Sequence, residues 1–100
     1  MIDFSQVTGF QWDDGNARKN SDSHDVSQRE AELVFMDPRL LIVDDVDHSY
    51  EEARFHAFGF IPSGRLVHVT FTIRNFGTTI RVISARDMEE YEEGIYVQGA

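Results

Sequence analysis

The stretch Ile80-Arg81-Val82-Ile83-Ser84-Ala85-Arg86 decides the fold, because it predicts a buried β-strand with one arginine inside it and a second at its end. Branched residues such as Ile80 and Val82 favour the interior of a sheet. Arg81 alternates with them, so its guanidinium group is expected on the opposite face of the strand. A sheet with one apolar and one polar face is therefore the starting point for the rest of the chain.

The composition predicts a single domain whose affinity for polyanions is local. Apolar residues make up 41% of the 100-residue chain, which is enough for one core at this length. Eighteen acidic against nine basic residues give a net charge of −9, so any polyanion site must be a concentrated patch. The absence of cysteine excludes disulfides, thiolate zinc sites and cysteine nucleophiles. With no signal-peptide pattern and no long apolar run, we expect a cytoplasmic protein without a membrane partner.

The first half of the chain predicts helices. Residues 1–9 are interpreted as a loose N-terminal arm and residues 10–100 as one domain, which begins with a short strand over residues 9–13. A mostly exposed helix is expected over residues 14–24, where an apolar stripe is missing. A second helix begins at Ser27, which forms a capping box with Glu30, and ends before Pro38.

The second half predicts strands joined by tight turns. We expect strands over residues 40–44, 53–61, 65–74 and 78–85, and a short helix after residue 86 that ends at Gly94. The predicted fold class is α+β, an antiparallel meander sheet packed against two N-terminal helices and followed by a short C-terminal helix. If the meander pairs in order, one sheet face gathers a polar set: Arg54, His56, His68, Thr70, Thr72, Arg74 and Arg81.

This polar set contains the residue types that metal-independent RNA cleavage needs. The reaction requires a base for the 2′-hydroxyl, an acid for the 5′-oxygen and fixed cations that face the phosphate. Arginine offers a planar fork that matches phosphate oxygens, and histidine titrates near neutral pH. The competing interpretation is structural, since a single arginine or histidine on such a face is more often solvent-exposed or ion-paired.

Other candidates are weaker. Lys19 shares a helix face with Asn16 and Ser23, and His24 closes the same segment, where cations also favour a helix carboxyl end. The acidic run from Asp44 to His48 lacks the glycine and the distal glutamate of a calcium loop, so a solvated turn and no metal site are expected. No serine stands in a nucleophile elbow.

Taken in order, several motifs resemble the BrnT toxins of bacterial toxin–antitoxin pairs. The resemblance covers residues 10–96 and rests on Phe10-Gln11-Trp12-Asp13, Asn20, His24-Asp25-Val26, Phe35-Met36-Asp37-Pro38, Arg54 with Gly59, Thr72 with Arg74, and Arg81-Val82-Ile83-Ser84-Ala85-Arg86. It implies a RelE-like fold and a ribonuclease toxin without a cofactor. It also implies a BrnA-like antitoxin as partner, through which the pair would bind its operator DNA.

The resemblance and the polar face together give two sets of candidate residues. His24, Arg54, Arg74 and Arg81 are expected to be catalytic, in proton transfer or phosphate stabilisation, and His56 is a second candidate for proton transfer. Lys19, His56, His68 and Arg86 are expected to bind RNA.

The chain also departs from the family pattern. Lysines usually stand at the positions of Asn16, Ser23 and Asp87, and the usual C-terminal helix is rich in arginine. Here residues 87–93 contain five acids. These departures motivate an alternative function, in which a catalytically weakened BrnT-fold protein serves as an antitoxin-binding, autoregulatory module.

Overall fold

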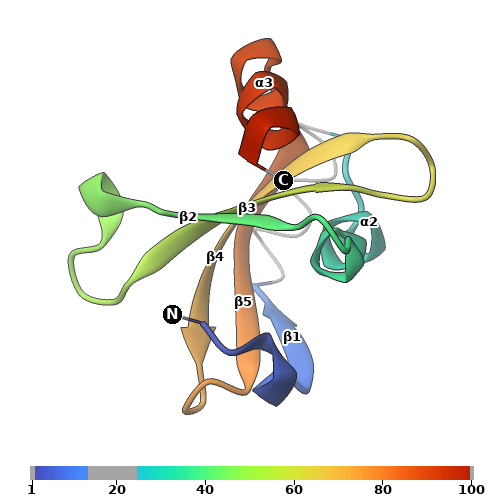
Figure 1. Ribbon diagram of the computed structural model, residues 1–100. Helices are drawn as coiled ribbons and strands as arrows, with labels where there is room; N and C mark the ends of the chain where they lie inside the picture. The colour runs from blue at the N-terminus through green and yellow to red at the C-terminus, as the bar shows by residue number, and fades with distance from the viewer. Residues whose placement is uncertain (1, 14–24, 100) are drawn as a thin grey trace.

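In the described part of the protein, a five-stranded sheet carries one main helix on each face (Figure 1). The computed structural model describes residues 2–13 and 25–99. The strands are β1 (Gly9–Trp12), β2 (Leu41–Asp44), β3 (Arg54–Phe60), β4 (Leu66–Arg74) and β5 (Thr79–Asp87), and the helices are α2 (Gln28–Leu33) and α3 (Glu90–Gly99). Short 3-10 turns are η1 (Phe4–Gln6), η2 (Val34–Met36) and η3 (Val46–His48). The helix predicted for residues 14–24 lies outside the described residues. Of the two predicted N-terminal helices, the structure therefore describes the second, α2.

The sheet is mixed, in the order β1-β5-β4-β3-β2. Strands β2 to β5 form the predicted antiparallel meander, but β1 pairs in parallel with β5, from Gly9 beside Thr79 to Trp12 beside Val82. The prediction of an entirely antiparallel sheet is therefore wrong at this edge. The physical reason is the long connection after β1, which carries the chain to the far edge before the meander begins, as parallel neighbours require.

The helix α2 packs on the apolar face of the sheet. Its capping box forms as predicted, since the Ser27 hydroxyl accepts from the Glu30 amide and the Glu30 carboxylate accepts from the Ser27 amide. Ala31 and Val34 are fully buried. They belong to the core cluster with Ala57, Val67, Val69, Phe71, Ile80, Val82 and Ala85. The strand residues other than Ala85 have the parity that the sequence assigned to the apolar face, and Ala85 reaches this face because the register shifts within β5.

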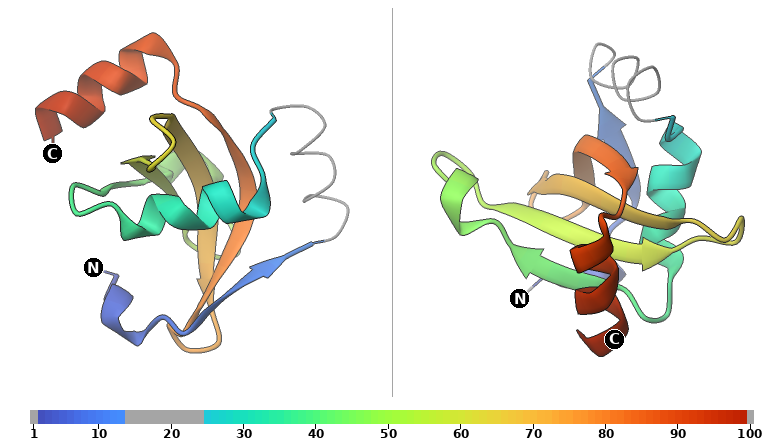
Figure 2. Two further views of the ribbon diagram at one scale, coloured as in Figure 1. Left: turned by 90° about the vertical axis from the view of Figure 1, so that its right-hand side faces the viewer. Right: turned by 90° about the horizontal axis from the view of Figure 1, so that it is seen from above.

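The helix α3 lies apart from α2 and packs on the opposite face (Figure 2). Tyr96 is buried with Phe58 and Met88, and its hydroxyl donates to Asp37 at 2.6 Å. The predicted end of this helix at Gly94 is wrong, because the helix continues to Gly99. The contacts of Tyr96 hold the extra turn, and they overcome the low helix propensity of glycine.

The first described residues take part in the core. The Phe4 ring lies 5.9 Å from the Phe35 ring and 6.4 Å from the Phe71 ring. The Thr8 amide donates to the Thr78 carbonyl at 2.8 Å. These contacts tie residues 4–8 to the sheet, where the sequence predicted a loose arm.

The polar face gathers as predicted, and a β-bulge extends it. Cross-strand neighbours form three rows, Arg54–Thr72–Arg81–Gln11, His56–Thr70–Ser84 and Phe58–His68–Arg86. The register shifts between Thr70 and Phe71, so β5 has one residue more than β4 over this stretch. Without the bulge, strict alternation would place Arg81 and Arg86 on opposite faces, because five positions separate them. The bulge therefore unites all the predicted arginines of β5 with the rest of the polar set.

We expect Gly59→Ala to destabilise the fold by about 1–3 kcal/mol through overpacking. A Cβ atom at Gly59 would lie 2.9 Å from both the Cγ1 and the carbonyl oxygen of Val34. Gly9→Ala is the matched control, because no atom lies within 4 Å of its Cβ position. Urea unfolding of both variants measures the difference, and equal losses would contradict the packing argument.

We expect Asp37→Asn to lower the stability near neutral pH by about 1–3 kcal/mol, because the carboxylate accepts three hydrogen bonds. The donors are the Tyr96 hydroxyl and the amides of Phe60 and Arg39. Burial opposes ionisation of Asp37, but these hydrogen bonds bring its pKa below the usual value. Its stabilising effect is thus present above the unfolded-state pKa and is lost as the pH falls through the folded-state pKa.

The gap between wild type and Asp37→Asn in urea unfolding should therefore narrow towards pH 3. Asp44→Asn, at an exposed position, serves as the control. A gap that stays constant with pH would show that the carboxylate charge does not matter.

Candidate functional site

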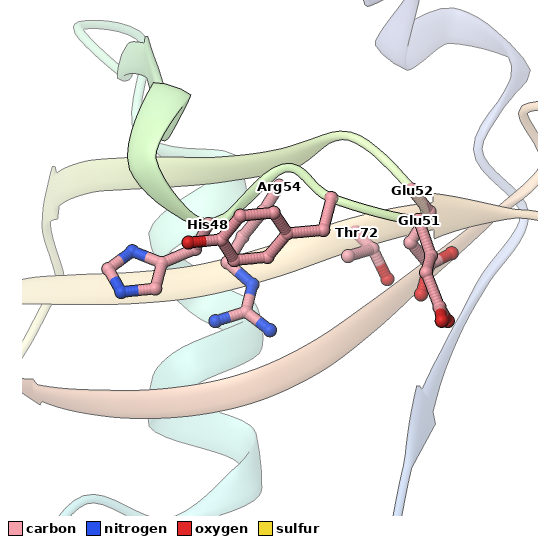
Figure 3. A pocket seen from close by; sticks show the side chains of 6 residues that line it. His48, Glu51, Glu52, Arg54 and Thr72 are labelled. Atoms are coloured by element: carbon pink, nitrogen blue, oxygen red, sulfur yellow. The ribbon is translucent and has the colours of Figure 1, made fainter.

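The polar face is hollowed where β3 begins. A cavity of about 280 Å³ is lined by His48, Tyr50, Glu51, Glu52, Arg54 and Thr72 (Figure 3). The loop before β3 supplies the first four of these residues, β3 supplies Arg54 and β4 supplies Thr72. Backbone bonds close the loop, since the Asp45 amide donates to the Arg54 carbonyl at 2.9 Å. Ser49 completes this closure, because its hydroxyl accepts from the Arg54 amide and donates to the Asp45 carbonyl.

The four arginines of the polar face fall into two pairs with different environments. Arg74 binds Glu52 at 2.8 Å, and Arg86 holds Glu92 with two bonds of 2.7 and 2.9 Å. The guanidinium groups of Arg54 and Arg81 form no hydrogen bond or ion pair with any residue of the described part of the chain. The cross-strand neighbour of both is Thr72. An anion on this face would therefore meet two cations that carry no bound carboxylate.

Glu52 marks where the positive charges of the face meet. The hydrogen bond from Arg74 lowers the pKa of Glu52, and the charges of Arg74, Arg81 and Arg54 add to the effect against the opposing influence of burial. Near neutral pH, Glu52 is thus ionised and bound to Arg74.

Three histidines and Asp45 form a connected chain beside the cavity. Asp45, 8% exposed, contacts the Nδ1 atom of His48 at 3.0 Å and the Nε2 atom of His56 at 3.1 Å. The Nδ1 atom of His56 lies 2.8 Å from the Nε2 atom of His68 and 3.1 Å from the Thr70 hydroxyl. Burial opposes ionisation of Asp45, but the hydrogen bond from His48 and the charges of His56 and His48 lower its pKa overall. One buried carboxylate therefore holds both His48, at the hollow, and His56 beside it.

His68 is the buried end of this chain. Its ring stacks on Phe58 at 4.6 Å, and its Nδ1 atom has no hydrogen-bond partner among the described residues, although Glu92 Oε2 lies 3.6 Å away. Burial, followed by the charge of Arg86, lowers the pKa of His68 to about 4, so the imidazole is neutral near pH 7. A second cavity of about 320 Å³ lies next to α3. It is lined by Arg86, Glu92 and the rings of His68 and Phe58, among others.

The structure brings most of the predicted site residues together on this face. Those in the described residues are Arg54, His56, His68, Arg74, Arg81 and Arg86. His24 and Lys19 lie outside the described residues. Sequence reasoning missed Asp45, His48, Tyr50 and Glu52, because the acidic run was interpreted as a solvated turn. The position of this run directly before β3 was the available signal, since residues next to a site-bearing strand often line the site.

Two further observations concern all the residues that the structure describes. Across residues 2–13 and 25–99, no three His, Asp or Glu side chains gather closely enough to hold a metal ion. Among the same residues, no helix has the length and apolarity needed to cross a membrane.

Comparison with known proteins places the fold and the sequence in one family. The family model described as "Ribonuclease toxin, BrnT, of type II toxin-antitoxin system" matches residues 12–92. A solved structure, the ribonuclease toxin BrnT of Brucella abortus, has a similar fold with a TM-score of 0.64 at 16% identity, and the match covers 84% of this chain and 100% of that one. A search of curated proteins finds no match. The chain belongs to the BrnT family of ribonuclease toxins of type II toxin–antitoxin systems.

Proposed function

We propose that this protein is an endoribonuclease that cleaves RNA without a metal ion or other cofactor and is neutralised by a cognate BrnA-like antitoxin. The observation that carries the proposal is a pair of arginines that bind no carboxylate among the described residues. They are Arg54 and Arg81, which stand on either side of Thr72. Family membership supplies the reaction class, since the family is one of ribonuclease toxins. The strand positions of the two arginines supply a reason why such a reaction would occur on this face.

The chemistry requires fixed positive charge at one phosphate. In RNA cleavage the 2′-hydroxyl attacks the neighbouring phosphorus, and negative charge grows on the phosphate oxygens in the transition state. Arg54 and Arg81 stand two strands apart, at a backbone separation of roughly 10 Å. Two long side chains can close that gap and contact one phosphate from both sides. Because rigid strands hold them, little rearrangement is needed when the charge develops.

The other arginines of the predicted site have supporting roles in this proposal. Arg74 and Arg86 already hold carboxylates, so they would bind RNA only after leaving Glu52 and Glu92. His56 and His68 stay within the hydrogen-bonded chain that links them to Asp45. His24 and Lys19 remain candidates from the sequence alone.

The proposal also includes where the toxin acts and how it would reach DNA. We propose that the toxin works in the cytoplasm, arrests growth when it is free, and approaches operator DNA only through its antitoxin. The net charge of −9 favours this arrangement, because such a chain has little general attraction for DNA.

A second candidate function follows from the acids on the same face. Carboxylates neutralise two of the four arginines, and α3 carries Glu90, Glu92 and Glu93 in its first turn. A protein with this balance could keep the BrnT fold as an antitoxin-binding, autoregulatory module with weakened catalysis. Expression without antitoxin separates the two functions. Growth arrest that requires Arg81 supports the ribonuclease, and normal growth with tight antitoxin binding supports the module.

We expect Arg54→Ala and Arg81→Ala each to reduce cleavage of single-stranded RNA by about 30- to 100-fold, as for the loss of a charged hydrogen bond in a transition state. The assay contains EDTA and follows RNA fragments over time. Arg29→Ala is the control, since this exposed arginine lies on α2 at the opposite face. Equal activity of Arg81→Ala and wild type would contradict the proposed site.

A further inference from the structure

His48 has one ring nitrogen bound by Asp45, and its side chain lines the hollow. Its Nδ1 atom lies 3.0 and 3.1 Å from the two carboxylate oxygens of Asp45. Its side chain is 60% exposed and lines the cavity that Arg54 and Thr72 also line. No described residue forms a hydrogen bond with its Nε2 atom. In the view of Figure 3, His48 and Arg54 lie on one side of the hollow, and Glu51 and Glu52 lie on the other.

Asp45 fixes the tautomer of His48. A carboxylate can only accept hydrogen bonds, so the proton of the neutral ring must sit on the nitrogen that Asp45 contacts. The lone pair then lies on Nε2, which accepts no hydrogen bond from a described residue. Asp45 is 8% exposed and its lowered pKa keeps it ionised near neutral pH. The arrangement follows the general pattern of a base whose orientation is set by a third group.

The other candidate groups at the hollow or beside it are less suited to act as the base. Both nitrogens of His56 contact partners, and His68 is buried. Glu52 is held by Arg74, which lowers its pKa and therefore its basicity. Glu51 and Tyr50 line the same hollow without a group that fixes them in place among the described residues.

We propose that His48 is the general base of RNA cleavage and that Asp45 is its positioning residue, an inference that rests on the proposed ribonuclease function. The Nε2 atom of His48 takes the proton of the 2′-hydroxyl, and the 2′-oxygen forms a bond to phosphorus while Arg54 and Arg81 face the phosphate oxygens. The bond from phosphorus to the 5′-oxygen breaks, and this oxygen takes a proton from water. The products are a 2′,3′-cyclic phosphate and a 5′-hydroxyl, and His48 returns its proton to the hydroxide that remains.

The first test is kinetic. We expect His48→Ala and His48→Asn to lower kcat by about 100-fold or more, with little change in KM, as for the loss of a general base. The other ionisable groups nearby are Asp45, Glu51, Glu52, Tyr50 and His56, and these variants leave all of them in place. Asp47→Asn, an exposed change in the same turn, should keep wild-type activity. Wild-type kcat in folded His48 variants, while Arg81→Ala still shows its reduced cleavage, would overturn the role of His48 and leave the ribonuclease proposal intact.

The second test does not depend on activity. In ¹⁵N NMR of wild-type protein at neutral pH, the His48 ring should carry its proton on Nδ1, and Asp45→Asn should shift the ring towards the Nε2-protonated form. Because His48 is exposed, its variants test the inference even if Asp45→Asn fails to fold. A wild-type ring protonated on Nε2 would overturn the inference whether or not the protein cleaves RNA. If wild type leaves RNA intact in the kinetic assay, the ribonuclease proposal and the base assignment both fall.

Discussion

The register of β3, β4 and β5 is the constraint on which the rest of the structure depends. It places Arg54, Thr72 and Arg81 in one row across three strands. The bulge at Thr70 then brings Arg86 to the same face, beside His68. A change of one residue in this register would send polar side chains into the core below α2 and apolar ones to the open face. Burial of fully enclosed residues such as Phe71 and Val69 on the other side makes that change costly.

Buried polar contacts give this face its order. Asp45 contacts His48 in its own loop. It also contacts His56 on β3, which in turn contacts His68 on β4. Glu92 binds Arg86 at the end of β5 and accepts a hydrogen bond from the Glu89 amide, just before α3. The two carboxylates thus anchor the loop and the C-terminal helix on the same polar surface. Such a network is stable because nearly every buried polar atom in it has a partner, and the exception is Nδ1 of His68.

The charge balance explains how a protein with a net charge of −9 could still bind a polyanion. Among the described residues, Arg65, Arg74 and Arg86 are paired with carboxylates. Arg65 binds both Asp87 and Glu30, which raises its pKa. Local attraction for phosphate then depends on the arginines that escape such pairing. Arg54 and Arg81 are arginines of this kind among the described residues of the polar face. The same pairing is what gives the alternative, weakly catalytic function its physical basis.

The sequence by itself determined the elements that local chemistry controls. The capping box at Ser27, the four strands of the meander and the parity of β4 could be predicted, because each depends on residues within a few positions of one another. The same alternation predicted that Arg54, His68 and Arg81 share a face.

Tertiary structure alone decided the parallel pairing of β1, the bulge in β4 and β5, and the helix beyond Gly94. It also decided which arginines are paired and turned a plain acidic run into the Asp45–His48 contact. These features depend on groups far apart in the chain or on a balance of burial and charge. Local sequence patterns carry little information about either.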